Sequence, residues 1–157
     1  MNSVVIYASR SGNTKKVADA VAEGLGERGL VEIHSVDDAP KDLRPFDLVV
    51  IGGPTEAHGM TPTMKGSLDS IEPSTINAKS CATFDTRLAW PRVLSGSAAE
   101  GIARWLREHD ASLVASPESF IVSTKPELQP GELERAHRWA RAIAQLVPAA
   151  EASAPVA

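Results

Sequence analysis

The stretch SVVIYASRSGNT, residues 3–14, decides the fold of this chain. Residues 3–8 form a short apolar run, which is typical of a buried strand. Residues 13–28 follow with apolar side chains at helical spacing, so the segment Ser9–Thr14 carries the chain from a strand into a helix. Hydroxyl groups and the free N–H groups of a helix N-terminus suit a phosphate, and Gly12 permits close approach of the backbone. We therefore predict an anion-binding loop here.

Other interpretations of this loop were weighed against phosphate binding. A Walker-type loop requires a longer glycine-framed span ending in Gly-Lys-Ser/Thr, and a dinucleotide fingerprint requires three spaced glycines. The segment Gly12-Asn13-Thr14-Lys15 supplies neither pattern. The plainer alternative is a strand-to-helix turn capped by the side chain of Ser11 or Asn13.

Strand and helix patterns alternate along the rest of the chain. This alternation predicts βαβ units and an α/β fold, a three-layer α/β/α sandwich around a doubly wound five-stranded parallel sheet. The alternating pattern of residues 31–36 predicts an edge strand, and the wholly apolar run 47–52 predicts a central one. Expected strands cover residues 3–8, 31–36, 47–52, 80–85 and a broken region between 111 and 122, with helices beginning near residues 13, 61, 97 and 131.

Length and composition bound the remaining possibilities. The 157 residues have the size of one domain, and we expect that domain to cover residues 1–147, followed by a disordered alanine- and proline-rich tail at 148–157. A formal net charge of -4 argues against a nucleic-acid partner, and no apolar run is long enough to span a bilayer. The single cysteine excludes an internal disulfide and suits the cytoplasm, and no signal peptide is recognised.

Two further segments follow predicted strands and are candidates for a ligand site. The first contains Pro54–Gly59, and the second runs from Asp85 to Ser95. Ligands of open parallel sheets bind beyond the carboxyl ends of the strands, where both segments are expected. The structural alternatives are a mobile connection that leaves His58 exposed, and a Trp90 side chain that closes over the edge of the core.

The cysteine invites a comparison with a different class of enzyme. Cys81 and Arg87 have the spacing of a Cys-x5-Arg phosphatase motif. A reactive thiolate requires backbone donors at a helix N-terminus, whereas Cys81 falls within an apolar strand. We therefore interpret this spacing as chance, and we predict no metal site and no catalytic residue.

The segment Ser9-Arg10-Ser11-Gly12-Asn13-Thr14 resembles the phosphate loop of flavodoxins, Ser/Thr-x-Ser/Thr-Gly-Asn-Thr. The order of strands and helices over residues 1–147 also resembles the flavodoxin plan, which implies the sheet order 2-1-3-4-5. The two candidate segments occupy the positions of the loops that flank the flavin ring in that family. The resemblance thus implies FMN as cofactor, with a phosphate end and a ring end.

If the residues at matching positions of this sequence have the roles that they have in flavodoxins, the resemblance implies a candidate FMN site. The phosphate would be held by the loop residues, and Gly59 would provide the peptide that can turn toward flavin N5. His58 stands where flavodoxins usually have an aromatic residue. The cofactor-binding candidates are Ser9, Arg10, Ser11, Gly12, Asn13 and Thr14 for the phosphate, and Pro54, Thr55, Glu56, Ala57, His58, Gly59, Asp85, Thr86, Arg87 and Trp90 for the ring.

Three functions are compatible with this interpretation. The favoured one is a flavoprotein that carries electrons to or from a redox protein or a small-molecule donor or acceptor. The second is a flavin-dependent NAD(P)H:quinone-type reductase, which would need space for its second substrate over the ring. The third is an interaction module of the same fold that binds flavin weakly or not at all.

Overall fold

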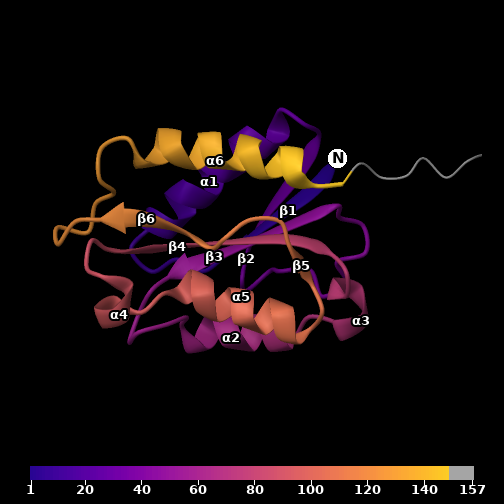
Figure 1. Cartoon of the computed structure of the whole chain (residues 1–157), viewed down its shortest axis with the longest axis horizontal. Helices are drawn as coiled ribbons and strands as arrows, with labels where there is room; N and C mark the ends of the chain where they lie inside the picture. Colours follow the sequence, from indigo (N-terminus) through magenta and orange to yellow (C-terminus); the bar gives the residue numbers. More distant parts are fainter. Residues whose placement is uncertain (149–157) are drawn as a thin grey trace, which may run out of the picture.

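The computed structural model describes residues 1–148, so the predicted tail at 148–157 lies outside the described residues except for Pro148. A central sheet separates two layers of helices (Figure 1). In chain order, the elements are β1 (Asn2–Tyr7), α1 (Asn13–Gly26), β2 (Leu30–Ser35), β3 (Leu48–Pro54), α2 (Pro62–Asp69), α3 (Pro73–Ile76), β4 (Ser80–Leu88), α4 (Arg92–Ser95), α5 (Ala98–Glu108), β5 (Ser112–Leu113), β6 (Glu118–Val122) and α6 (Glu132–Leu146). None of the helices among these residues is long and apolar enough to span a membrane.

The strands pair in the order β2-β1-β3-β4-β5, and β6 also pairs with β4. Every pairing within the sheet is parallel. The broken fifth strand consists of two pieces, because β5 pairs with the start of β4 at Ser80 and Cys81 while β6 pairs with Phe84–Leu88. The predicted three-layer α/β/α sandwich with sheet order 2-1-3-4-5 is confirmed.

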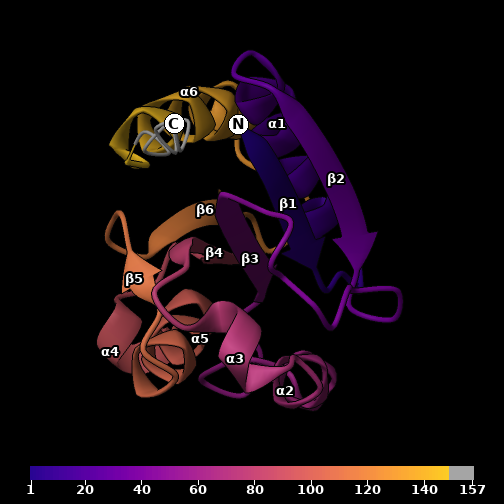
Figure 2. The same cartoon turned by 90° about the vertical axis from the view of Figure 1, so that its right-hand side faces the viewer.

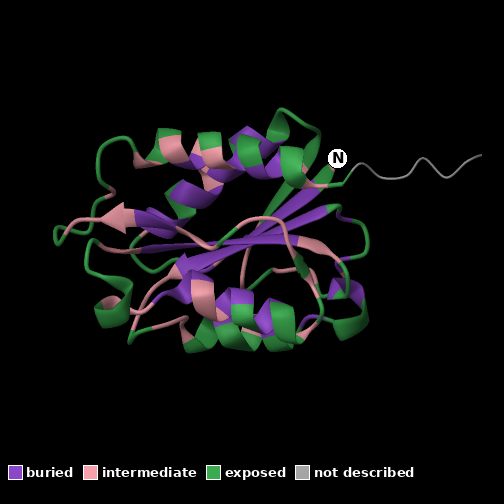
Figure 3. Ribbon diagram, viewed as in Figure 1, coloured by how far each residue is buried: buried purple, intermediate pink, exposed green. Residues whose placement is uncertain are grey.

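Helices α1 and α6 cover one face of the sheet, and α2, α3 and α5 cover the other (Figures 1 and 2). Side chains of a strand alternate between the two faces, so the neighbours Val4 and Val5 are both fully buried but belong to different cores. Phe84 and Phe120 contact edge to face on the α1–α6 side, with ring centroids 6.1 Å apart. Buried residues line the sheet and the inner helix faces (Figure 3).

The backbone N–H groups at the start of a helix lack acceptors unless a side chain caps them, and α1, α2 and α5 differ in this respect. Thr61 caps α2, because its hydroxyl accepts a hydrogen bond from the Met64 N–H. The Ser97 hydroxyl likewise accepts from the Glu100 N–H at the start of α5, where a helix was expected to begin. Helix α1 begins after Gly12 without a side-chain cap, so the alternative of a turn capped by Ser11 or Asn13 is not found.

The fourth strand is longer than its sequence pattern indicates. Strand β4 continues to Leu88, which places Asp85, Thr86 and Arg87 in the sheet rather than in a loop. This extension follows from pairing: Gly53 and Pro54 of β3 stand opposite Asp85 and Thr86, and β6 pairs along the other edge. The apolar pattern of the sequence ends at Asp85, because the polar residues after it are held in the strand by pairing with β3 and β6. Both strands are distant in the sequence, so a local pattern does not indicate this pairing.

Candidate functional site

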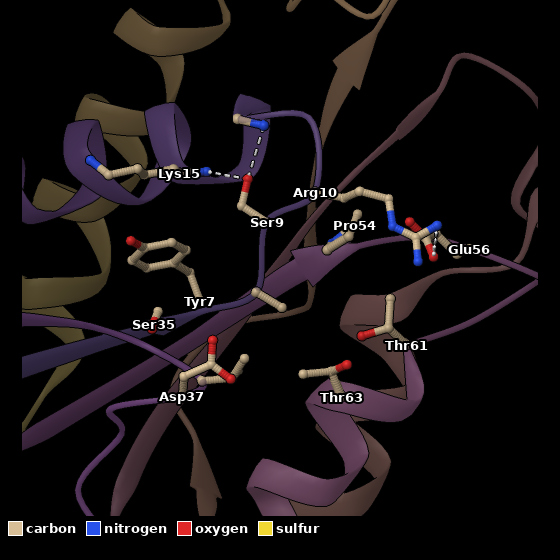
Figure 4. A pocket seen from close by; sticks show the side chains of 13 residues that line it. Tyr7, Ser9, Arg10, Lys15, Ser35, Asp37, Pro54, Glu56, Thr61 and Thr63 are labelled. Atoms are coloured by element: carbon tan, nitrogen blue, oxygen red, sulfur yellow. Dashed lines mark hydrogen bonds and ion pairs between the residues drawn. The ribbon is translucent and has the colours of Figure 1, made fainter.

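The loop between β1 and α1 gathers hydrogen-bond donors around one hydroxyl group. The Ser9 Oγ accepts from the N–H groups of Gly12 and Lys15, at 3.2 and 3.4 Å (Figure 4). Within residues 1–148, the N–H groups of Asn13 and Thr14 have no hydrogen-bond acceptor. Gly12 adopts φ +93°, a left-handed conformation that turns the chain into the helix. The Ser9 hydroxyl oxygen thus marks the place where an anionic oxygen would accept the same donors.

The side chains of Asn13 and Thr14 are buried and anchor this loop to other segments. The Asn13 amide donates to the Pro126 carbonyl at 2.8 Å and to the Ser11 hydroxyl at 3.3 Å. The Thr14 and Thr86 hydroxyl groups are 2.8 Å apart, which joins the loop to β4. These two side chains fix the shape of the loop, and its backbone supplies the free donors. Nothing in the sequence pattern pointed to the Pro126 carbonyl.

A pocket of about 420 Å³ lies beside the loop, at the carboxyl ends of β1, β2 and β3. It brings together five predicted residues, namely Ser9, Arg10, Gly12, Pro54 and Glu56. It also contains residues that the sequence analysis missed, and Figure 4 shows how they surround the cavity: Tyr7, Lys15, Ser35, Asp37, Thr61 and Thr63. Part of this second set could have been predicted. The expected sheet order places β2 next to β1, so the residues at the carboxyl end of β2 must lie beside the loop.

Two ion pairs set the charge at the rim of this pocket. Arg10 of the phosphate loop contacts Glu56 across the pocket at 3.4 Å. Lys15 pairs with Asp19 one helical turn further along α1 at 2.9 Å, and this hydrogen bond raises the pKa of Lys15. Both cations are exposed, so neither pair contributes much to stability. Each of these two cations at the rim is therefore balanced by a carboxylate.

The segment after β3 forms a tight turn. The Glu56 N–H donates to the Gly59 carbonyl and the Gly59 N–H to the Glu56 carbonyl, both at 2.9 Å. The two central residues, Ala57 and His58, have φ values of +45° and +73°. Left-handed conformations are costly for residues that carry a Cβ, and such strain tends to occur at functional sites.

Replacing His58 with glycine should stabilise the protein by about 1 kcal/mol, since glycine adopts positive φ without the Cβ penalty. Chemical denaturation of H58G, H58A and the parent protein measures this difference. His58→Ala is the matched control, because it also removes the imidazole but keeps the strain. Equal stability of the two variants would show that the turn is not strained.

The two segments expected to flank a flavin ring contact each other, because the Thr55 N–H donates to the Thr86 carbonyl at 2.9 Å. His58 also forms a β-bridge with Gly96, just after the second segment, and a Cβ at Gly96 would clash with the His58 carbonyl oxygen. The Thr55 hydroxyl accepts from the Ala98 N–H at 3.0 Å. His58 and Gly59 therefore line a separate hollow near the start of α5, and not the pocket beside the phosphate loop.

Asp85 and Arg87 lie on the α5 side of β4. Asp85 is fully buried, and one of its carboxylate oxygens accepts from the Ser97 hydroxyl at 2.5 Å and the Ala99 N–H at 3.1 Å. Arg87 donates to the Trp90 carbonyl at 2.6 Å, and the Trp90 side chain is 57% exposed. The other Asp85 oxygen and the Arg87 Nε are buried without a partner among the described residues. Asp85 thus stabilises the start of α5 and leaves one free acceptor.

Metal binding and phosphatase chemistry are not supported by the described residues. Residues 1–148 contain no cluster of three or more His, Cys, Asp or Glu side chains that could hold a metal ion. Cys81 is buried in β4, and burial raises the pKa of its thiol to about 12, so that the group stays protonated at neutral pH. A phosphatase nucleophile requires the thiolate, which agrees with the interpretation of the Cys-x5-Arg spacing as chance.

Comparisons with known proteins agree with this fold. Residues 4–89, more than half of the chain, match the family model described as a flavodoxin domain. A flavodoxin of Aquifex aeolicus (strain VF5) is 39% identical over 71 residues, which are 43% of this chain and only 38% of that protein. A flavodoxin structure from the domain Archaea covers 94% of this chain and 99% of its own, with a TM-score of 0.76 and 24% identity. Oxidised flavodoxin 1 from Bacillus cereus covers 92% and 98%, with a TM-score of 0.75 and 21% identity.

A parallel α/β/α sandwich with an anion-binding turn after its first strand defines a class of proteins that bind phosphate-bearing ligands at the strand ends. The chain belongs to the flavodoxin domain family. FMN is the cofactor of this family. The free N–H groups of Asn13 and Thr14 fit its phosphate. One Asp85 oxygen and the Arg87 Nε are also buried without a partner among the described residues.

Proposed function

We propose that this protein binds FMN through the Ser9–Thr14 loop and transfers electrons with it. The observation that carries the proposal is the start of α1, where donors already converge on the Ser9 hydroxyl without a side-chain cap. Backbone donors and the positive end of a helix dipole stabilise a phosphate at a helix start. When bound, FMN supplies one- and two-electron redox chemistry.

In this proposal the residues of the chain have separate roles. Backbone N–H groups of Asn13 and Thr14 donate to the phosphate, and the hydroxyl groups of Ser9 and Ser11 lie in reach of it. Arg10 adds positive charge. The ring-end roles of Pro54–Gly59 and of Asp85, Thr86, Arg87 and Trp90 belong to the proposal as well. The hydrogen bond from the Thr55 N–H to the Thr86 carbonyl, at 2.9 Å, supports a ring end formed by both segments.

Replacing Thr14 with valine should weaken FMN binding by about 1–3 kcal/mol. The hydroxyl of Thr14 is 2.8 Å from that of Thr86, and its loss leaves a buried hydroxyl without its partner beside the phosphate loop. Titration of the apoprotein with FMN, followed by flavin fluorescence, measures the change. Thr14→Ser restores the hydroxyl and should retain the parent affinity. If T14V binds FMN as tightly as the parent protein, the contact between the Thr14 and Thr86 hydroxyl groups does not support the phosphate site.

A flavin-dependent reductase is the second candidate. The hollow lined by His58 and Gly59, with a volume of about 410 Å³, favours it, because such an enzyme needs room for another substrate at the ring end. Kinetics separate the two functions. A carrier in its oxidised form should oxidise NADH slowly with or without a quinone. Rapid NADH oxidation that depends on a quinone would identify a reductase. If the protein binds no FMN at all, both redox functions are excluded, and an interaction module of the same fold is the remaining function.

We further propose that residues 1–147 act as one domain in the cytoplasm. One sheet carries both helical layers, which supports a single folding unit. The only cysteine is buried and free, which suits a reducing compartment. The redox partner is proposed only by class, as a redox protein or a small-molecule donor or acceptor.

A further inference from the structure

We propose that the free edge of β2 joins two copies of this chain through an antiparallel strand pair, with Ile33 on the two-fold axis. The inference goes beyond flavin binding and concerns the outer edge of the sheet. The partner is a second copy of the chain, and one sheet runs through both copies of the dimer.

Strand β2 is an edge strand whose backbone is free along its outer side. Among the described residues it pairs only with β1, and Figure 2 shows it at the outer edge of the sheet. The Val36 N–H donates to the Tyr7 carbonyl at 2.9 Å, and the backbone groups of successive residues in a strand point to opposite sides. The N–H groups of Val31, Ile33 and Ser35 therefore face away from β1. Such a row of free groups is a template for pairing with another strand.

This edge lacks the features that usually prevent strand pairing. Residues 30–35 contain no proline and no lysine, and their register with β1 continues over six residues without a bulge. Two large apolar side chains on the strand are exposed, since Leu30 is 76% and Ile33 41% accessible to solvent. A regular edge that exposes apolar side chains is typical of a contact surface.

The charges of β2 select one register for pairing with a second copy. In a two-fold antiparallel pair, outward-facing backbone groups meet only if the axis passes through a residue position. An axis at Glu32 would place two carboxylates opposite each other, and an axis at His34 would place two imidazole rings opposite each other. With the axis at Ile33, Glu32 of each copy stands opposite His34 of the other. This register alone, of the three, pairs an acid with a base.

The same register covers both exposed apolar side chains. Ile33 contacts its own copy on the face that carries α1, because Val31, two residues before it, packs into the core beneath α1. Leu30 stands opposite Val36 of the other copy, on the other face of the sheet. The helices also fit: α1 lies over β1 and β2 (Figure 2). Two α1 helices would thus be separated by two strand spacings, about 10 Å, a distance at which helices pack.

Sedimentation velocity of the FMN-loaded protein tests the dimer. One strand pair buries an area near the lower limit of specific interfaces, so we expect a dissociation constant of about 100 µM, and the mean mass should rise from one chain to two between about 10 µM and 1 mM. Ile33→Lys places like charges on the axis and should keep the protein monomeric. Leu133→Lys is the matched control, because Leu133 of α6 is 39% exposed and lies away from this edge. It should dimerise like the parent protein.

Cysteine crosslinking tests the register. Opposite residues that exchange both backbone hydrogen bonds have Cα atoms about 5.5 Å apart, within the range of a disulfide. Ile33→Cys should therefore form a covalent dimer when diamide oxidises the two thiols. Leu30→Cys is the control: position 30 is more exposed, but its two copies would lie about 20 Å apart and should not crosslink. The native Cys81 is buried and should not react.

Three results would overturn the proposal: a parent protein that stays monomeric at about 1 mM, an I33K protein that dimerises like the parent, or equal crosslinking of I33C and L30C. Flavin absorbance of each sample reports FMN binding separately, because Ile33 does not line the pocket beside the phosphate loop. An FMN-loaded protein that stays monomeric retains the proposed flavin function and loses the dimer. A protein that dimerises without taking up FMN keeps the dimer and loses the flavin function.

Discussion

Replacing Ser11 with aspartate should weaken FMN binding by more than 100-fold while leaving the fold intact. Ser11 is exposed and precedes the first turn of α1. A carboxylate there would repel the phosphate by about 3 kcal/mol for each unit of phosphate charge, taking a separation of about 5 Å and an effective dielectric constant of about 20. The same carboxylate interacts favourably with the helix dipole, so the melting temperature should stay the same or rise slightly.

Ser11→Asn is the matched control for the charge. It has the same shape as the aspartate variant but no negative charge, and it should lose at most about tenfold in FMN affinity, the equivalent of one hydrogen bond. Fluorescence titration gives the affinities, and thermal unfolding monitors the fold. If S11D and S11N bind FMN with equal affinity, the phosphate of FMN does not bind at this loop.

Replacing Asp85 with alanine should lower the free energy of unfolding by about 3–5 kcal/mol, the cost of two hydrogen bonds to a charged group. The Ser97 hydroxyl and the Ala99 N–H both donate to this fully buried carboxylate, and both lie at the start of α5. Urea denaturation measures the loss. The large effect distinguishes a structural cap from a residue that only lines a cofactor site.

Two controls define what Asp85 does. Asp38→Ala removes an exposed carboxylate and should change stability by less than about 0.5 kcal/mol. Asp85→Asn keeps one acceptor oxygen and should lie between the alanine variant and the parent protein. A D85A protein of nearly parental stability with weak FMN binding would instead place this carboxylate at the flavin ring alone.

The sequence was sufficient to predict the fold, because each of its signals is local. Apolar runs such as residues 47–52 mark strands, and Ser97 followed by Glu100 marks a helix start. These signals depend on neighbours within a few residues, and parallel connections leave few ways to arrange the elements. The broken fifth strand was also visible, since each of its two pieces has its own apolar pattern.

The site was harder to predict because its contacts join distant segments. Thr86 and Arg87 come after the predicted strand 80–85 and were expected in a loop, but the pairing with β3 and β6 extends β4 past Asp85 to Leu88. Asp37 has no motif around it, and only the pairing of β2 with β1 shows that it lies near the phosphate loop. The bond between Asn13 and Pro126 spans 113 residues, and no pattern in one sequence indicates it.

The most direct test of the central claim compares FMN with riboflavin, which has the same ring and ribityl chain but no phosphate. The apoprotein is titrated with each ligand under identical conditions, and flavin fluorescence reports binding. If the start of α1 holds the phosphate, FMN should bind with one-to-one stoichiometry and riboflavin at least about 100-fold more weakly, since charge-assisted hydrogen bonds to the phosphate are lost. Equal affinities for the two flavins, or no binding of FMN, would contradict this account.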